Sequence, residues 1–165
     1  WSQNEEAAAW NEKYASVLQC DESLINGFES VFPIASAQYS ELPDSGYFYG
    51  EVHICELNDG STQEEAISFL SGFTEAVANA DYSDTSYHLG NYFNVDESGG
   101  FLWANFTNSE ESMNKANTSF ESSVRETMFP IFSTFASCGE VPDLYHGFTL
   151  YNADDKDFMP TFPSN

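Results

Sequence analysis

The stretch YFYGEVHICELNDGSTQEE, residues 47–65, decides the fold class, because it predicts a strand, a turn and a helix start in direct succession. Residues 47–57 are rich in β-branched and aromatic side chains, which favour extended backbone. The NDG sequence at 58–60 is typical of a tight turn. Ser and Thr at 61–62 precede the two glutamates at 64–65 by three residues, the spacing of a capping box at a helix N-terminus.

The segments that follow continue the alternation of helix and strand. Residues 87–95 and 101–106 predict two strands joined by a Gly-containing hairpin loop. Asn108, with Glu111 three residues later, predicts the start of a second helix, and residues 144–151 predict the last strand. The two helices carry apolar stripes at three- and four-residue spacing: Ile67, Leu70, Phe73 and Val77 in the first, and Met113, Ala116, Phe120, Val124 and Met128 in the second.

From residue 46 onward the predicted order is therefore strand, helix, strand, strand, helix, strand. This order predicts a ferredoxin-like α+β fold, a four-stranded antiparallel sheet with both helices on one face. A four-helix arrangement is the alternative, but it fits the period-two segments poorly. We divide the chain into a helical N-terminal part at 1–45, a ferredoxin-like domain at 46–152 and a polar tail at 153–165.

An internal recurrence bears on the N-terminal part. The phrase ESVFPIAS at 29–36 returns as ETMFPIFS at 126–133. Residues 5–19 and 24–32 have helical periodicity, and Pro33 disrupts the second of these segments. The recurrence predicts that each phrase ends a helix packed on a sheet, so that residues 1–45 are the back half of a repeated unit. Chance recurrence of a short aromatic-proline phrase is the alternative interpretation.

The composition excludes several partners. The 165 residues carry 27 Asp and Glu against four Lys and Arg, a net charge of −23. This field repels phosphate backbones and anionic lipids, so we expect neither nucleic-acid nor membrane binding. High acidity is typical of soluble or salt-tolerant proteins, with an acidic docking surface as the alternative. We expect an exported protein, or a cytoplasmic one from a salt-adapted organism, and the first residue, Trp1, favours a processed or fragmentary chain.

Neither the cysteine spacing nor any sequence motif predicts a particular cofactor. Cys20, Cys55 and Cys138 form no CxxC or zinc-like spacing, so no metal site is predicted. An odd number leaves at least one cysteine unpaired within the chain, and the sequence does not choose a disulfide pair. GxGxxG, P-loop, GxSxG and HExxH motifs are absent from the sequence.

The segment EVHICELNDGSTQEEAISFLSGFTEAV at 51–77, followed by the hairpin that contains FLWANF at 101–106, resembles the dimeric α+β-barrel superfamily. This superfamily includes stress-responsive barrel proteins and antibiotic-biosynthesis-monooxygenase-like proteins, and the resemblance covers roughly residues 46–152. It implies that two four-stranded sheets close into a barrel, by dimerisation or by pairing of tandem repeats. Its members include cofactor-less oxygenases and haem-binding proteins.

Candidate site residues follow from strand alternation. Tyr49, Glu51 and His53 share one face of the first strand, and His146 lies on the same face of the last strand, its predicted neighbour. Trp103 on the third strand is a candidate pocket wall or a core residue. We expect Tyr49, Glu51, His53 and His146 to converge on the face away from the helices, inside a barrel or at a dimer interface. A His beside a carboxylate can act as a general base or as a haem or metal ligand; the alternative is a set of half-buried interface residues.

Three functions are consistent with this pattern. The first is binding of a small, largely apolar molecule by a homo-oligomer that associates through its sheet face. The second is a cofactor-independent, monooxygenase-like enzyme with His53 or His146 as general base. The third is a structural or assembly module without a ligand site.

Overall fold

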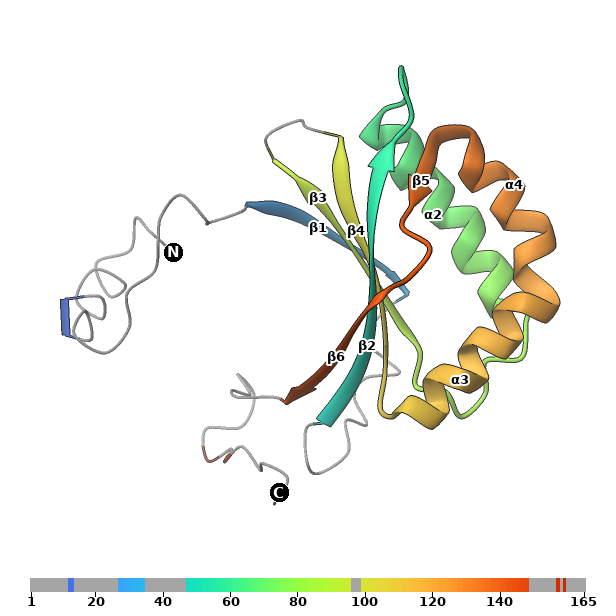
Figure 1. Ribbon diagram of the computed structural model, residues 1–165. Helices are drawn as coiled ribbons and strands as arrows, with labels where there is room; N and C mark the ends of the chain where they lie inside the picture. The colour runs from blue at the N-terminus through green and yellow to red at the C-terminus, as the bar shows by residue number, and fades with distance from the viewer. Residues whose placement is uncertain are drawn as a thin grey trace.

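A computed structural model describes residues 12–13, 27–34, 47–95, 99–148, 157 and 159. A six-stranded antiparallel sheet forms one layer, and helices cover one of its faces (Figure 1). The strands are β1 (Phe28–Ile34), β2 (Tyr47–Leu57), β3 (His88–Asn94), β4 (Gly100–Thr107), β5 (Ala136–Cys138) and β6 (Asp143–Phe148). The helices are α2 (Gln63–Ala78), α3 (Glu110–Ser119), the π-helical turn η3 (Phe120–Val124) and α4 (Arg125–Phe135). The predicted α+β class is confirmed.

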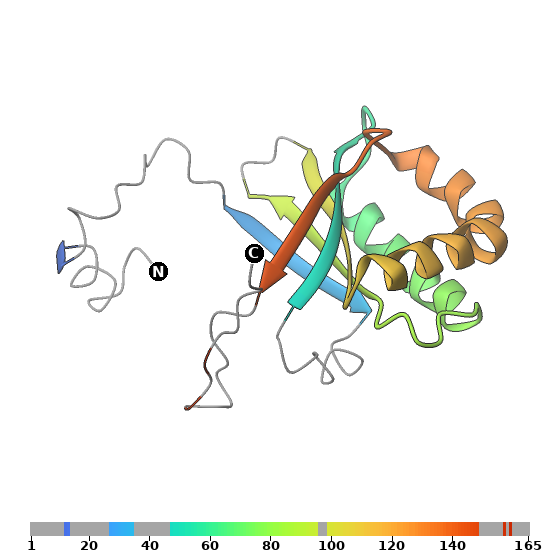
Figure 2. The ribbon, with the colours of Figure 1, turned by 60° about the horizontal axis from the view of Figure 1, so that its bottom comes forward.

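The strand order places β2 and β4 at the centre of the sheet. The order runs β1-β3-β4-β2, and the far edge of β2 pairs with both β5 and β6. Because β2 is 11 residues long, β6 can pair with its first half and β5 with its last three residues. Figure 2 shows β6 running alongside β2. The prediction that the strands at 47–57 and 144–151 are neighbours is confirmed by the pairing of β2 with β6.

Local sequence signals explain where the helices begin. Thr62 is the N-cap of α2: its hydroxyl accepts from the Glu65 N–H, and its own N–H donates to Glu65 Oε2 at 2.8 Å. The predicted capping box is confirmed. The N-cap of α3 is Ser109, whose Oγ accepts from the Ser112 N–H at 3.2 Å, so the prediction of Asn108 as the cap is wrong by one residue.

The recurring phrase adopts two different structures. The first copy lies in β1, which pairs with β3 at the sheet edge, so the predicted helix over residues 28–32 is wrong. Pro33 lies where the β1–β3 register shifts, a position in an edge strand that tolerates its missing N–H. The second copy lies inside α4, where Pro130 is an interior residue and does not end the helix. Tertiary pairing overrides local pattern here, and the shared helix-ending role is wrong.

The hydrophobic core lies between the sheet and the helices. The predicted stripe residues Leu70, Phe73 and Val77 of α2 are buried there, with Ile67 packed at its margin. A disulfide joins Cys55 in β2 to Cys138 in β5 and closes this core at the sheet edge. The short strand β5 was not predicted, because three residues carry no periodicity.

Some predictions lie outside the described residues. The helix predicted at 5–19 does so except for Glu12 and Lys13, which are helical. Cys20 also lies outside the described residues. The tail at 153–165 lies outside them except for Asp157 and Met159. None of the described helices is both long and apolar enough to cross a membrane.

Candidate functional site

The five predicted site residues share one face of the sheet, as was expected for the four on the first and last predicted strands. Tyr49, Glu51 and His53 alternate along β2. His146 of β6 lies directly opposite Tyr49, and Trp103 of β4 lies directly opposite His53. Residues directly opposite in an antiparallel pair project to the same side of the sheet.

This shared face is the one covered by helices, so its predicted location on the opposite face is wrong. The Trp103 ring lies 5.0 Å from that of Phe73 in α2 and 5.7 Å from that of Phe132 in α4. Glu51 Oε2 accepts from Asn117 Nδ2 of α3 at 3.1 Å. Strand alternation determines which residues share a face, but it does not determine which of the two faces the helices cover.

An aromatic cluster surrounds Trp103 between the two layers. Its indole N–H donates to Asn105 Oδ1 at 3.1 Å, and the Tyr87 hydroxyl donates to the same oxygen at 2.7 Å. These bonds fix the plane of the indole. The rings around it, linked by centroid distances of 5.0–6.4 Å, are Phe69, Phe73, Phe120, Phe132 and Phe135.

The helix layer does not seal the middle of this face. Cys55 and Phe101 are 0% and 2% exposed, whereas His53 and Trp103, the next pair along the same two strands, are only half-buried. Glu51 is half-buried as well. We call the partly accessible set the helix-side strip; it consists of Glu51, His53, Trp103, Asn117 and Phe132.

The chemistry of the strip centres on His53. Its Nδ1 lies 3.3 Å from the carbonyl oxygen of Gly139. Because a carbonyl can only accept, this bond assigns the proton of the neutral imidazole to Nδ1 and leaves the lone pair on Nε2. His53 can therefore accept a proton or a hydrogen bond through Nε2 beside the indole of Trp103.

His146 belongs to a separate group. Its Nδ1 is hydrogen-bonded to the Tyr47 hydroxyl, and its ring lies 5.2 Å from that of Tyr49. Tyr49 and His53 are four residues apart on β2, about 13 Å at about 3.3 Å per residue. The two imidazoles therefore share a face but do not converge. Burial raises the pKa of Tyr49, and the nearby carboxylates of Glu110 and Glu51 add to this, so its phenol stays protonated at neutral pH.

Asn117 and Phe132 were missed by sequence reasoning. Both lie on the long helical segment whose inner stripe was recognised: Asn117 follows Met113 by four residues, and Phe132 follows Met128 by four. The helical period alone would have placed them toward the sheet. They were overlooked because Asn117 is polar and because the helix was expected to end at Pro130.

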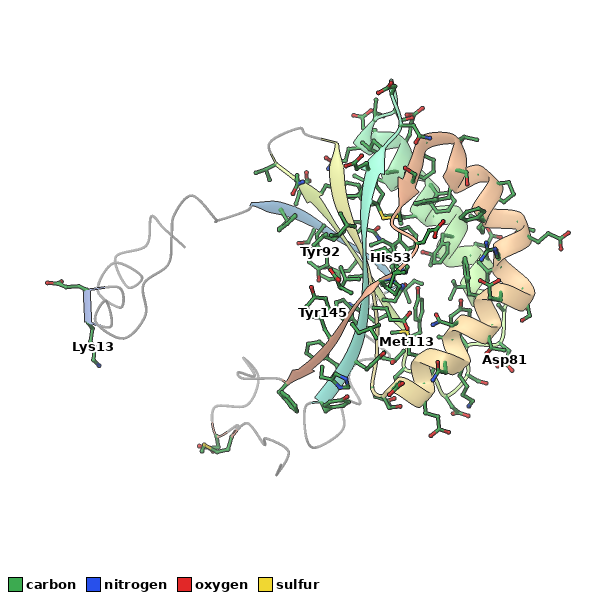
Figure 3. The ribbon with its side chains drawn as sticks, viewed as in Figure 1. Lys13, His53, Asp81, Tyr92, Met113 and Tyr145 are labelled. Carbon is green, nitrogen blue, oxygen red and sulfur yellow. A yellow bond between two sulfur atoms is a disulfide. The ribbon has the colours of Figure 1, made fainter. Side chains whose placement is uncertain are left out.

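The opposite face of the sheet carries aromatic residues, and none of the five predicted site residues lies on it. We call this side the open face, since no described helix covers it; Figure 3 shows Tyr92 and Tyr145 there, with His53 on the helix side. Ring contacts with centroids 5.5–6.4 Å apart join one continuous aromatic layer on it, made of Phe28, Phe32, Phe48, His88, Tyr92 and Phe106.

Two glycines make room for the rings of Phe48 and Phe106. A Cβ at Gly147 would lie 1.9 Å from Phe48 Cζ, and one at Gly50 would lie 3.0 Å from the ring of Phe106. In a chain of net charge −23, the described strand residues of the open face include only two charged side chains, Glu56 and Asp143. The open face is thus an aromatic, nearly uncharged surface.

A polar depression of about 410 Å³ lies elsewhere, between the loop after α2 and helix α3. Its lining residues are Asp81, Ser83, Thr85, Glu111, Asn114, Lys115, Thr118 and Ser119. Hydrogen bonds from Ser83 lower the pKa of Asp81. None of the predicted site residues lines this depression, and most of its side chains are exposed.

Within the described part of the chain, no group of three or more His, Cys, Asp or Glu side chains could hold a metal ion. Comparison of the chain with protein-family models, curated proteins and solved structures found no match.

Proposed function

We propose that this chain is a ferredoxin-like domain of the dimeric α+β-barrel kind that binds a small, largely apolar molecule. The strand order β3-β4-β2-β6, with α2 after β2 and α3–α4 after β4, is the order of a ferredoxin-like unit. In this interpretation β1 is an additional edge strand next to β3.

The observation that carries the ligand proposal is the partial exposure of Trp103 and His53 at the centre of a helix-covered face. Ligand sites are mostly apolar surfaces with a few well-placed polar groups. Trp103 and Phe132 offer aromatic area, while Glu51, Asn117 and His53 Nε2 offer polar contacts at its edge. The ligand therefore lies against the indole and presents a hydrogen-bond donor to His53.

The open face supports the dimer. Five strands at about 4.8 Å spacing and about seven residues at about 3.3 Å each give a footprint of about 550 Å². Two such faces bury about 1,100 Å², above the roughly 1,000 Å² expected of a specific interface. A second copy matches this face because its own open face is equally aromatic and nearly free of charge.

Binding of the neutral, largely apolar dye N-phenyl-1-naphthylamine, whose N–H can donate to His53 Nε2, tests the ligand site. We expect His53→Ala and Trp103→Ala to weaken dye binding at least tenfold, while His146→Ala, the matched control, leaves it unchanged. Unchanged binding by the His53 and Trp103 variants would show that the helix-side strip is not the site. An Ile54→Lys variant on the open face separates dye bound there from dye bound at the strip.

A cofactor-independent enzyme is the second candidate, favoured by the tautomer that Gly139 imposes on His53. With its lone pair on Nε2, His53 is oriented as a general base toward a molecule held against Trp103. Its test is the same binding assay followed by turnover of the bound compound, in which His53→Gln retains binding and abolishes turnover.

We also propose export to an oxidising compartment, supported by the Cys55–Cys138 disulfide. Disulfides persist in secreted and periplasmic proteins and are rare in most cytosols. Alkylation of free thiols in source cells, followed by peptide mapping, tests this. A fully reduced pair in the cell would contradict export.

A further inference from the structure

His88 occupies a distinctive place in the aromatic layer of the open face. It begins β3 opposite Phe106, and its ring lies 6.1 Å from that of Phe106 and 5.5 Å from that of Phe32. The imidazole thus fills the gap between a β1 ring and a β4 ring. The chain has three histidines, and the other two, His53 and His146, lie on the opposite face.

Few charged groups face His88 from the described elements. β1 and β4 present the rings of Phe32 and Phe106, and β3 itself presents Tyr92 on the same side. The acidic residue of β1, Glu29, points to the helix side, where it accepts from Gln63 Nε2. The carboxylates on the open face, Glu56 and Asp143, belong to β2 and β6, with β4 between those strands and β3. Burial lowers the pKa of His88, which shows that this environment favours the neutral imidazole.

We propose that His88 makes the dimer acid-sensitive: protonation of its imidazole places a cation between two aromatic sheet faces and separates the two copies. This inference rests on the proposed dimer through the open face. Association would remove the remaining water from the half-buried imidazole, and the low dielectric would then disfavour its charged form further. By linkage, a group that binds its proton more weakly in the dimer weakens the dimer when the pH falls.

The direction in which acid changes dimer affinity distinguishes the His88 effect from the general charge repulsion between copies. The chain carries a charge of −23 at pH 7 and has a pI of about 4.1, so acidification toward pH 5 reduces repulsion between copies. Without His88, the dimer should therefore become tighter at pH 5. A dimer that becomes weaker on acidification requires a group that must be neutral in the interface.

Sedimentation equilibrium at pH 7.5 and pH 5.0 tests the proposal. A pKa one unit lower in the dimer corresponds to about a tenfold weaker dimer for each protonated imidazole, and the dimer holds two. We therefore expect the dissociation constant of the wild type to rise about ten- to 100-fold at pH 5.0. His88→Gln, which keeps a polar side chain but does not titrate, should show no rise or a fall. The double variant His53→Gln/His146→Gln, the matched control, should behave like the wild type.

The outcomes separate this inference from the proposed dimer. A wild type that is dimeric at pH 7.5 and equally or more tightly associated at pH 5.0 overturns the acid switch alone. An equal rise in the wild type and His88→Gln also overturns it. A wild type that is monomeric at pH 7.5 overturns both proposals. Circular dichroism at pH 5.0 must show a folded chain, because unfolding in place of dissociation contradicts the mechanism.

Discussion

The Cys55–Cys138 disulfide is expected to supply a large share of the stability of this domain. It joins residues directly opposite each other in β2 and β5, at a sequence separation of 83. Cross-linking a loop of this length removes chain entropy from the unfolded state worth about 4.5 kcal/mol in the loop-closure model. That amount is comparable with the whole free energy of unfolding of many single domains, about 5–15 kcal/mol.

The perturbation is the double replacement Cys55→Ala/Cys138→Ala, which leaves no unpaired thiol at this position. We expect the free energy of unfolding to fall by about 3–5 kcal/mol in urea titrations followed by circular dichroism, at fixed protein concentration. Cys20→Ala, which removes a cysteine outside this disulfide, is the matched control. A loss below about 1 kcal/mol for the double variant would refute the reasoning, as would a non-reducing peptide map without a Cys55–Cys138 link.

Three further predictions concern stability. Thr62→Ala removes the hydroxyl that accepts the Glu65 N–H and should lower the free energy of unfolding by about 1 kcal/mol in urea titrations. Gly147→Ala forces a Cβ into the Phe48 ring and should lower the melting temperature. Gly72→Ala on α2, where the nearest atom is 3.6 Å away, should instead raise the free energy of unfolding by about 0.5–1 kcal/mol. Equal effects of the two substitutions would contradict the packing described for the open face. Because burial lowers the pKa of His88, the unfolded chain binds more protons, and stability attributable to His88 should be lost as the pH falls below about 6.5. Comparison of wild type and His88→Gln in urea titrations between pH 7.5 and 5 checks this, and identical pH slopes would contradict it.

The central strands and α2 could be predicted from sequence because each carries a strong local signal. Alternating β-branched and aromatic residues marked β2, and the Thr62–Glu65 box marked the start of α2. The Phe-Pro-Ile phrase could not be assigned in this way. It is a strand where β3 is available as a partner and a helix where it continues from η3, so its structure depends on contacts distant in sequence.

The candidate site was predicted only in part, because strand alternation is a local signal whereas the packing of the helices and the strand register are not. The period of two correctly grouped Tyr49, Glu51 and His53 on one face, and the neighbouring last strand added His146. The face that the helices cover depends on how the connections cross the sheet, which the alternation within a single strand does not reveal. The distance between His53 and His146 depends on the register of β6 against β2, and that register placed His146 beside Tyr49.

Native mass spectrometry of the protein purified from its source tests the central claim most directly, because one spectrum reports both the number of chains and any bound small molecule. The account predicts a species of twice the 18.4 kDa chain mass, with an additional small-molecule mass that is lost in the Trp103→Ala variant. A single 18.4 kDa chain without any bound molecule would contradict it.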